Sequence, residues 1–168
     1  NDNYLRSILG NEIIDITEDT LGNLWVASFI GLNRINKQDF SIKKYTDDSH
    51  LEKGMLCDTI NCLLYDAKGQ IWLGTSQGVL ILDPETDSFK SLQSNTRNFK
   101  SLSSNNITCL MEDYSGNIWI GTDNGLNKFI TESGSIISFF SDGKPGSLVS
   151  NHITALEMED PTHIYIGT

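Results

Sequence analysis

Hydrophobic residues along the chain gather in short runs that alternate with turn-forming residues, which is the pattern of a β-meander. The run Ile107–Glu112 is followed by Asp113–Gly116, where an aspartate can accept backbone N–H bonds and a glycine can adopt positive φ. Further strands are predicted over Asn117–Thr122, Leu126–Ile130 and Ile136–Phe140. This part of the chain therefore predicts four short antiparallel strands joined by tight turns.

The same arrangement recurs along the chain. Trp25, Trp72 and Trp119 follow one another at intervals of 47 residues, and Tyr165 comes 46 residues later. Each aromatic residue has an isoleucine 12 positions before it, and these are Ile13, Ile60, Ile107 and Ile153. Such a period is typical of helical HEAT or armadillo arrays and of propeller blades. The β-branched, aromatic and glycine-containing runs favour strands, and hence the propeller.

The predicted fold class is therefore all-β, a β-propeller segment of about three and a half four-stranded antiparallel blades. The blades are predicted at about 11–50, 58–97 and 105–145, with a half-blade at 151–168. Such a segment leaves two bare flanks of roughly 300 Å² each at the usual strand spacing. Two arrangements would cover them: missing blades supplied by a longer parent chain, or a homodimer in which two copies complete one ring.

Two sets of repeated residues are predicted to be structural. Trp25, Trp72, Trp119 and Tyr165 are expected to pack between blades, each burying roughly 150–250 Å². The first turns carry an aspartate and a glycine, at Asp19 and Gly22, Asp66 and Gly69, and Asp113 and Gly116. They resemble the Asp-box hairpins of sialidases, but glycoside hydrolysis needs two carboxylates that converge at about 5–10 Å on one bond. No unrepeated pair of this kind stands out, so these aspartates are expected to tie down loops.

Charge and composition exclude several classes of function. The 168 residues carry a formal net charge of −10, which repels phosphate backbones, so no nucleic-acid partner is expected. No apolar run approaches the roughly 18 residues of a membrane helix. The histidines His50, His152 and His163 are dispersed and predict no metal site, and the sequence has no phosphate loop or nucleophile elbow. We therefore expect neither an enzyme nor a cofactor.

The cysteines predict packing rather than cross-linking. Cys62 and Cys109 share one position of the repeat and are expected on neighbouring inner strands, as small apolar residues. Cys57 makes the count odd, so the chain does not read as a disulfide scaffold.

Variable loops on one face of the array are the candidates for ligand contact, because loops held by a rigid scaffold often carry binding residues. Turns between second and third strands share this face with the segments that enter first strands. Their carboxylates and amides, with one aromatic ring, suit sugar hydroxyls and equally suit a solvated rim. The candidate ligand-binding residues are Phe29, Asp58, Asn105, Asn106, Asp123, Asn124, Asn151 and His152.

The repeated motif resembles the two-component regulator propeller repeat. Its pattern is Asn-x-Ile-x-x-Leu followed by Asp-x-x-Gly-Asn-Ile-Trp-Ile-Gly-Thr-x-x-Gly-Leu, and Asn105–Asn127 matches it nearly throughout. Asp58–Leu80 matches less fully, and Asn11–Asn33 has Ala27–Ser28 in place of Gly-Thr. The last copy has Tyr165 in place of tryptophan.

This resemblance implies the periplasmic sensor region of Bacteroides-type hybrid two-component histidine kinases, which detect breakdown products of complex glycans. It implies a non-enzymatic extracytoplasmic role in oligosaccharide sensing and receptor dimerisation, with any histidine kinase outside this chain. The alternative is a propeller scaffold for protein–protein interaction with no small ligand. A propeller lyase or hydrolase is a third class, for which no catalytic constellation is visible.

Overall fold

The computed structural model describes residues 7–46, 59–95, 97 and 101–168. These residues form three four-stranded sheets and one two-stranded sheet, each antiparallel with its strands in chain order. Blade one consists of β1 (Ile13–Glu18), β2 (Asn23–Ser28), β3 (Gly31–Asn36) and β4 (Ile42–Tyr45). Blade two consists of β5 (Ile60–Tyr65), β6 (Ile71–Thr75), β7 (Gly78–Asp83) and β8 (Ser88–Leu92). Blade three consists of β9 (Ile107–Glu112), β10 (Ile118–Thr122), β11 (Gly125–Ile130) and β12 (Ser135–Phe139), and the half-blade of β13 (Ala155–Asp160) and β14 (His163–Gly167).

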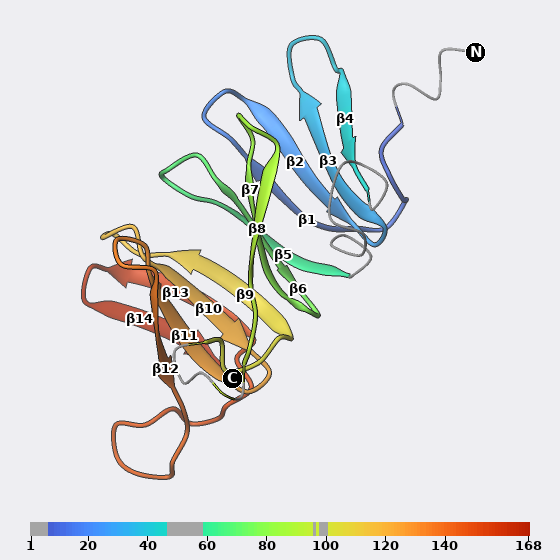
Figure 1. Cartoon of the computed structure of the whole chain (residues 1–168). Coiled ribbons are helices and arrows are strands. Elements are labelled where there is room, and N and C mark those ends of the chain that lie inside the picture. The colour runs from blue at the N-terminus through green and yellow to red at the C-terminus, as the bar shows by residue number, and fades with distance from the viewer. Residues whose placement is uncertain (1–6, 47–58, 96, 98–100) are drawn as a thin grey trace.

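The sheets follow one another in chain order across the molecule (Figure 1). Their first strands are neighbours, since β1 contacts β5, β5 contacts β9, and β9 contacts β13. Sheets stacked about a shared row of first strands are the blades of a β-propeller. The described blades do not close into a ring. The predicted fold class, an all-β β-propeller segment, is therefore confirmed.

The predicted strands of blade three agree with the structure to within a residue or so. β9 has the predicted bounds, while β10 begins one residue later than predicted, at Ile118, and β11 one residue earlier, at Gly125. The described segments consist of strands, turns and loops, and none of them supplies a helix of the length and hydropathy needed to cross a membrane.

Each first turn is held by its aspartate. In blade two, Asp66 is buried, and its Oδ1 accepts a hydrogen bond from Gln70 N at 2.8 Å. Its Oδ2 accepts the indole Nε1–H of Trp72 at 2.7 Å. Gly69 has a φ of 83°, a conformation that favours glycine. The same indole bond joins Asp19 to Trp25 at 2.9 Å and Asp113 to Trp119 at 3.1 Å.

The core lies between the blades. Trp25 is fully buried and belongs to a cluster that contains Leu82 from β7, with Phe89 from β8 packed against it. Trp72 is equally buried, and its ring lies 5.4 Å from the ring of Phe129 on β11 of the next blade. Thus Trp72 packs against the third strand of the next blade, and Trp25 shares a core cluster with residues of the next blade.

The last aromatic position departs from the expected burial. Tyr165 is 59% exposed, and Trp119 is only partly buried. The half-blade has no described third or fourth strand, so little covers this flank. Tyr165 still keeps the relation between turn and ring, because its hydroxyl donates to Glu159 Oε2 at 2.6 Å. Glu159 thus bonds the aromatic residue, whereas Asp160 Oδ1 accepts the backbone N–H groups of Thr162 and His163 in this turn.

Side chains of the first strands join neighbouring blades near the axis. Asp15 Oδ2 on β1 accepts a hydrogen bond from Leu63 N on β5 at 2.7 Å, and Asn61 Nδ2 on β5 donates to Ile107 O on β9 at 2.7 Å. These bonds satisfy backbone groups that an exposed strand edge would leave unpaired.

The two described cysteines also lie on these first strands, as unbridged thiols on β5 and β9. Burial raises the pKa of the Cys62 thiol, which keeps it protonated, and burial also raises the pKa of Cys109. Both therefore behave as small apolar side chains. Cys57 lies outside the described residues.

Candidate functional site

Backbone hydrogen bonds join the loops that carry the predicted ligand-binding residues. The turn between β6 and β7 bonds to the segment entering β9, through Gly78 N and Asn105 O at 2.7 Å. The turn between β10 and β11 bonds in the same way to the segment entering β13, through Gly125 N and Asn151 O at 2.7 Å. Second turns and entering segments therefore share one face, which we call the second-turn rim.

Two of the predicted ligand-binding residues, Asn105 and Asn151, accept hydrogen bonds from the backbone. Asn105 Oδ1 accepts a hydrogen bond from Ser94 N at 2.6 Å, and Asn151 Oδ1 accepts one from Ser141 N at 2.6 Å. Each asparagine thereby fastens the segment that leaves the previous fourth strand. The signal for this role was the recurrence of asparagine two residues before the repeated isoleucine.

The other rim residues are open to solvent. Asn106 Nδ2 donates to Asp123 Oδ2 at 3.2 Å, and Asn124 and His152 are also exposed. Phe29 is 57% exposed on blade one, two blades away from Asp123. Asp58 lies outside the described residues. The structure thus places these side chains on one face but on separate blades, and they do not line any of the cavities described below.

The sequence interpretation did not predict a structural role for the buried asparagines on the third strands. Asn127 Oδ1 on β11 accepts a hydrogen bond from Ser103 N at 3.0 Å, and Asn33 Oδ1 on β3 accepts one from Leu9 N at 2.7 Å. Both asparagines are fully buried and fasten segments near the rim to their blade. Blade two has Leu80 at this position, so the signal was present in only two copies.

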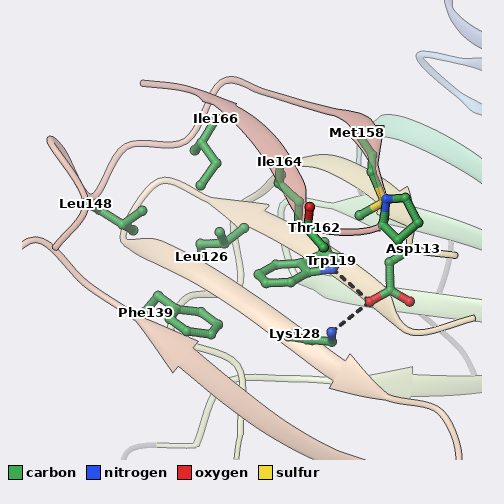
Figure 2. Close-up of a pocket in the computed structure, with 11 residues that line it drawn as sticks. Asp113, Trp119, Leu126, Lys128, Phe139, Leu148, Met158, Thr162, Ile164 and Ile166 are labelled. Atoms are coloured by element: carbon green, nitrogen blue, oxygen red, sulfur yellow. Dashed lines mark hydrogen bonds and ion pairs between the residues drawn. The ribbon is translucent and has the colours of Figure 1, made fainter. Parts of the chain in front are cut away.

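A cavity of about 350 Å³ lies between blade three and the half-blade (Figure 2). The ring of Trp119 stacks against Phe139 at 5.6 Å, and Lys128 Nζ lies 4.8 Å from the Trp119 ring centroid. Ile164 and Ile166 on β14 line the cavity from the half-blade. We call this space the Trp119 cavity.

Its one described ion pair joins Lys128 Nζ to Asp113 Oδ2 at 2.7 Å. Partial burial alone would raise the pKa of Asp113, but the Lys128 ammonium and hydrogen bonds from Asn117 and Trp119 outweigh it and lower the pKa to about 2. Asp113 is therefore ionised and fully engaged at neutral pH, which suits a structural carboxylate rather than a general acid.

A second, more polar cavity of about 360 Å³ lies between blades one and two, at the first-turn end. Thr20 Oγ1 and Tyr65 Oη are joined by a hydrogen bond of 2.8 Å across the blades. Gln70 and Glu85 add an amide and a carboxylate to the lining. The sequence interpretation did not foresee this cavity, because its lining comes from two copies of the repeat and combines repeated turn residues such as Asp19 and Gly69 with variable ones such as Thr20 and Glu85.

The stacked sheets, tryptophans packed between blades and aspartate-held turns define the chain as a β-propeller segment. Three stretches, residues 7–29, 54–77 and 101–124, match the family model described as the two component regulator propeller. The chain therefore carries repeats of the two-component regulator propeller family. No curated protein matches the chain.

Solved structures resemble the chain in fold. The extracellular domain of BT3049 from B. thetaiotaomicron, described as a hybrid two component system, aligns with a TM-score of 0.81 at 23% identity, over 95% of this chain and 22% of that one. The extracellular domain of BT4673 from B. thetaiotaomicron aligns with a TM-score of 0.77 at 22% identity, over 96% and 21%. The chain thus spans about a fifth of the length of these structures.

Enzymes share the architecture as well. Virginiamycin B lyase from Staphylococcus aureus aligns with a TM-score of 0.67 at 16% identity, over 92% of this chain and 48% of the lyase chain. At such identities, likeness to these structures shows the fold alone, because one fold serves many functions.

Proposed function

We propose that the chain is a non-enzymatic part of an extracytoplasmic, periplasmic sensor of a hybrid two-component signalling protein, where it contributes to oligosaccharide sensing. The observation that carries this proposal is the set of three two-component regulator propeller repeats in a fold like that of extracellular domains described as hybrid two component systems. The histidine kinase of such a system would lie outside this chain.

The chemistry of the second-turn rim supports a sugar ligand. Asn106, Asp123 and Asn124 offer exposed amide and carboxylate groups for hydroxyls, and Phe29 offers an exposed ring for the apolar face of a sugar. In contrast, Asn105 and Asn151 are engaged in structural hydrogen bonds. We therefore assign ligand contact to the former residues.

A non-enzymatic role fits the state of the repeated carboxylates. Asp19, Asp66 and Asp113 each accept an indole hydrogen bond and backbone hydrogen bonds from their own turn. An acid or base in catalysis must instead reach a proton of the substrate.

Titration calorimetry of the chain against a panel of neutral and acidic oligosaccharides tests the proposal. We expect at least one of them to bind, and we expect Phe29→Ala to weaken that binding at least about 10-fold, the order expected for losing an aromatic contact. Phe40→Ala is the matched control, because Phe40 is 62% exposed in the turn between β3 and β4, at the opposite end of the same blade.

Failure of every oligosaccharide to bind would reject the sensing role and favour the protein–protein scaffold. Equal weakening by both variants would place the ligand away from the rim.

A further inference from the structure

A carboxylate of blade two neutralises a lysine on the fourth strand of blade one. Lys43 on β4 forms an ion pair with Asp87, which lies in the turn between β7 and β8. The same carboxylate accepts a hydrogen bond from Tyr45 Oη at 3.0 Å. Arg34, the cross-strand neighbour of Lys43, places its guanidinium 5.7 Å from the ring centroid of Trp25. Basic and acidic side chains thus meet at the outer edge of this interface.

The next interface, between blades two and three, lacks the acidic partner. Lys90 on β8 is the repeat equivalent of Lys43, but Gly134 takes the position of Asp87. Ile81 likewise takes the position of the arginine of blade one. In the part of the chain that the structure describes, Lys90 forms no ion pair. A lysine that is neutralised in one interface is therefore left without a counter-charge in the next.

Blade two also leaves an amide group free for other partners. In blades one and three an asparagine before the repeated tryptophan bonds to the turn aspartate, as Asn23 Nδ2 does to Asp19 Oδ2 at 2.8 Å and Asn117 Nδ2 to Asp113 Oδ1 at 3.2 Å. Gln70 takes this position in blade two. Among the hydrogen bonds of the described residues, its backbone N–H takes part in one to the turn but its side-chain amide takes part in none.

The unpaired lysine and the free amide line the same cavity, of about 170 Å³, between blades two and three. Lys68 adds a second ammonium group, and Phe129 an apolar wall. The volume is several times the roughly 30 Å³ of a liquid water, so one carboxylate group fits inside. Lys68 and Gln70 also line the polar cavity of about 360 Å³ between blades one and two, so the two cavities adjoin at these side chains.

Two carboxylates of the protein feel the charge of these lysines without pairing with them. Asp83 Oδ1 accepts the N–H of Glu85 at 2.9 Å, and Glu112 Oε2 accepts the N–H of Ala67 at 2.9 Å. Because backbone groups hold both carboxylates, the two ammonium groups keep the capacity to bind a further anion.

We propose that Lys90, Lys68 and Gln70 form a carboxylate-binding site between blades two and three, which takes the uronate unit of an acidic saccharide. The carboxylate of the ligand occupies the place that Asp87 fills one interface earlier. Ammonium and amide groups are donors only or donors in part, and a carboxylate offers them acceptors only. The choice of a saccharide rests on the proposed sensing function, whereas the choice of a carboxylate rests on the unpaired lysine.

The adjoining polar cavity sets the orientation of the ligand. The hydroxyl groups of Thr20 and Tyr65, which bond to each other at 2.8 Å, can exchange hydrogen bonds with the hydroxyls of a neighbouring sugar unit. Glu85 lines this cavity and repels a second carboxylate. The uronate therefore lies at Lys90, and the unit in the polar cavity is neutral.

Titration calorimetry of the chain with cellobiouronate, which is glucuronate linked to glucose, and with the neutral cellobiose tests the proposal. We expect cellobiouronate to bind at least about 10-fold more tightly than cellobiose, and Lys90→Gln to remove this difference, because a hydrogen bond to a charged group is lost. Lys43→Gln is the matched control. It removes the same charge from the equivalent position, where Asp87 already occupies the lysine, so the affinity should not change.

Gly134→Asp supplies the missing carboxylate from the protein itself. A Cβ at Gly134 meets no atom within 4 Å, and Asp87 adopts a φ of 56° at the same repeat position, so aspartate is compatible with this turn. We expect Gly134→Asp to pair with Lys90 and to weaken the binding of cellobiouronate at least about 10-fold. Gly134→Asn, which has nearly the same shape without the charge, should retain the binding.

Cellobiouronate that fails to bind, or whose affinity is the same for Lys90→Gln and the parent chain, would overturn the proposal. A loss of binding with Phe29→Ala but not with Lys90→Gln would place the ligand at the second-turn rim, so that the sensing role stands and the carboxylate site falls. Binding of triglutamate in place of cellobiouronate, abolished by Lys90→Gln, would reject the saccharide in favour of an acidic peptide.

Discussion

The pairing of aspartate with tryptophan links the turn chemistry to the core. Asp66 is buried, and its two oxygens accept bonds from the backbone of its own turn and from the indole of Trp72. A buried carboxylate is stable only when such partners are present. The tryptophan is therefore selected both for its ring and for its N–H, and phenylalanine at this position would satisfy only half of the requirement.

We predict that Trp72→Ala lowers the free energy of unfolding by about 3–5 kcal/mol, because it empties the interface between blades two and three. Trp72→Phe keeps most of the ring volume but leaves Asp66 short of a donor, so a loss of about 1–3 kcal/mol is expected. Denaturant titration followed by circular dichroism measures both. An unchanged unfolding midpoint for Trp72→Ala would contradict its place in the core.

Acid should lower the free energy of unfolding by protonating Asp113. Its pKa is held at about 2 in the folded state, below the ordinary aspartate value of 3.8, because the Lys128 ammonium and hydrogen bonds from Asn117 and Trp119 outweigh the effect of burial. A depressed carboxyl pKa stabilises the fold above about pH 4, and this contribution is lost as pH falls from there through 2. The shift corresponds to about 2 kcal/mol.

Asp113→Asn should therefore flatten the dependence of stability on pH between 4 and 2, as seen in denaturation midpoints across that range. Lys128→Met should move the acid transition to higher pH, because it removes the ammonium that keeps the carboxylate ionised. The same pH profile for Lys128→Met and the parent chain would show that the ion pair contributes nothing.

At the scale of elements, the close approach of blades two and three depends on Gly74 in the second strand of blade two. A Cβ added at Gly74 would lie 2.5 Å from Cys62 Sγ and 2.7 Å from Ile107 of the next blade. Blade one has Ala27 here, and in place of a cysteine it has Asp15, whose side chain bonds to Leu63 of blade two. At these two positions blade two therefore combines glycine with cysteine, whereas blade one combines alanine with aspartate.

Gly74→Ala should destabilise the chain by about 1–3 kcal/mol, the usual cost of overpacking a core. Adding Cys62→Ala should recover part of this loss, because it removes one of the two clashing atoms. Thermal unfolding of the single and double variants measures both effects. If the double variant is no more stable than Gly74→Ala alone, the clash with Cys62 is not the cause.

At the scale of the whole molecule, stability should vary along the array because each blade is stabilised chiefly by its neighbours. All five residues of β6 in blade two are buried, whereas β14 in the half-blade has none that is fully buried. Blade two has a described neighbour on both sides, and the half-blade has one on one side only.

Native-state hydrogen exchange should therefore be slowest in β6 and β7 and fastest in β13 and β14, with blade one and blade three between them. Mass spectrometry of exchanged peptides can resolve the four sheets. Uniform protection across all of them would show that the array opens as one cooperative unit, contrary to this expectation.

Much of this architecture could be predicted from the sequence because the same residue pattern recurs in every blade. The spacing of Trp25, Trp72 and Trp119 predicted the stacked blades. The Asp-x-x-Gly turns predicted where each first strand ends and each second strand begins. Periodicity carries this information because equivalent residues must meet equivalent neighbours. Where the copies differ, as with Asn33 and Asn127 against Leu80, a sequence pattern gives a weaker signal.

What the sequence by itself determined is the local order: strand after strand, turn after turn, and the residues that recur at each. Only the tertiary structure decided which recurring residues are buried. Trp72 and Tyr165 occupy the same repeat position, yet one is buried and the other 59% exposed. The physical reason is that the side chain at this position is buried only when a neighbouring blade covers it. For Trp72, burial is set by side chains of the following blade, such as Ile118 and Phe129, which lie far away in the chain.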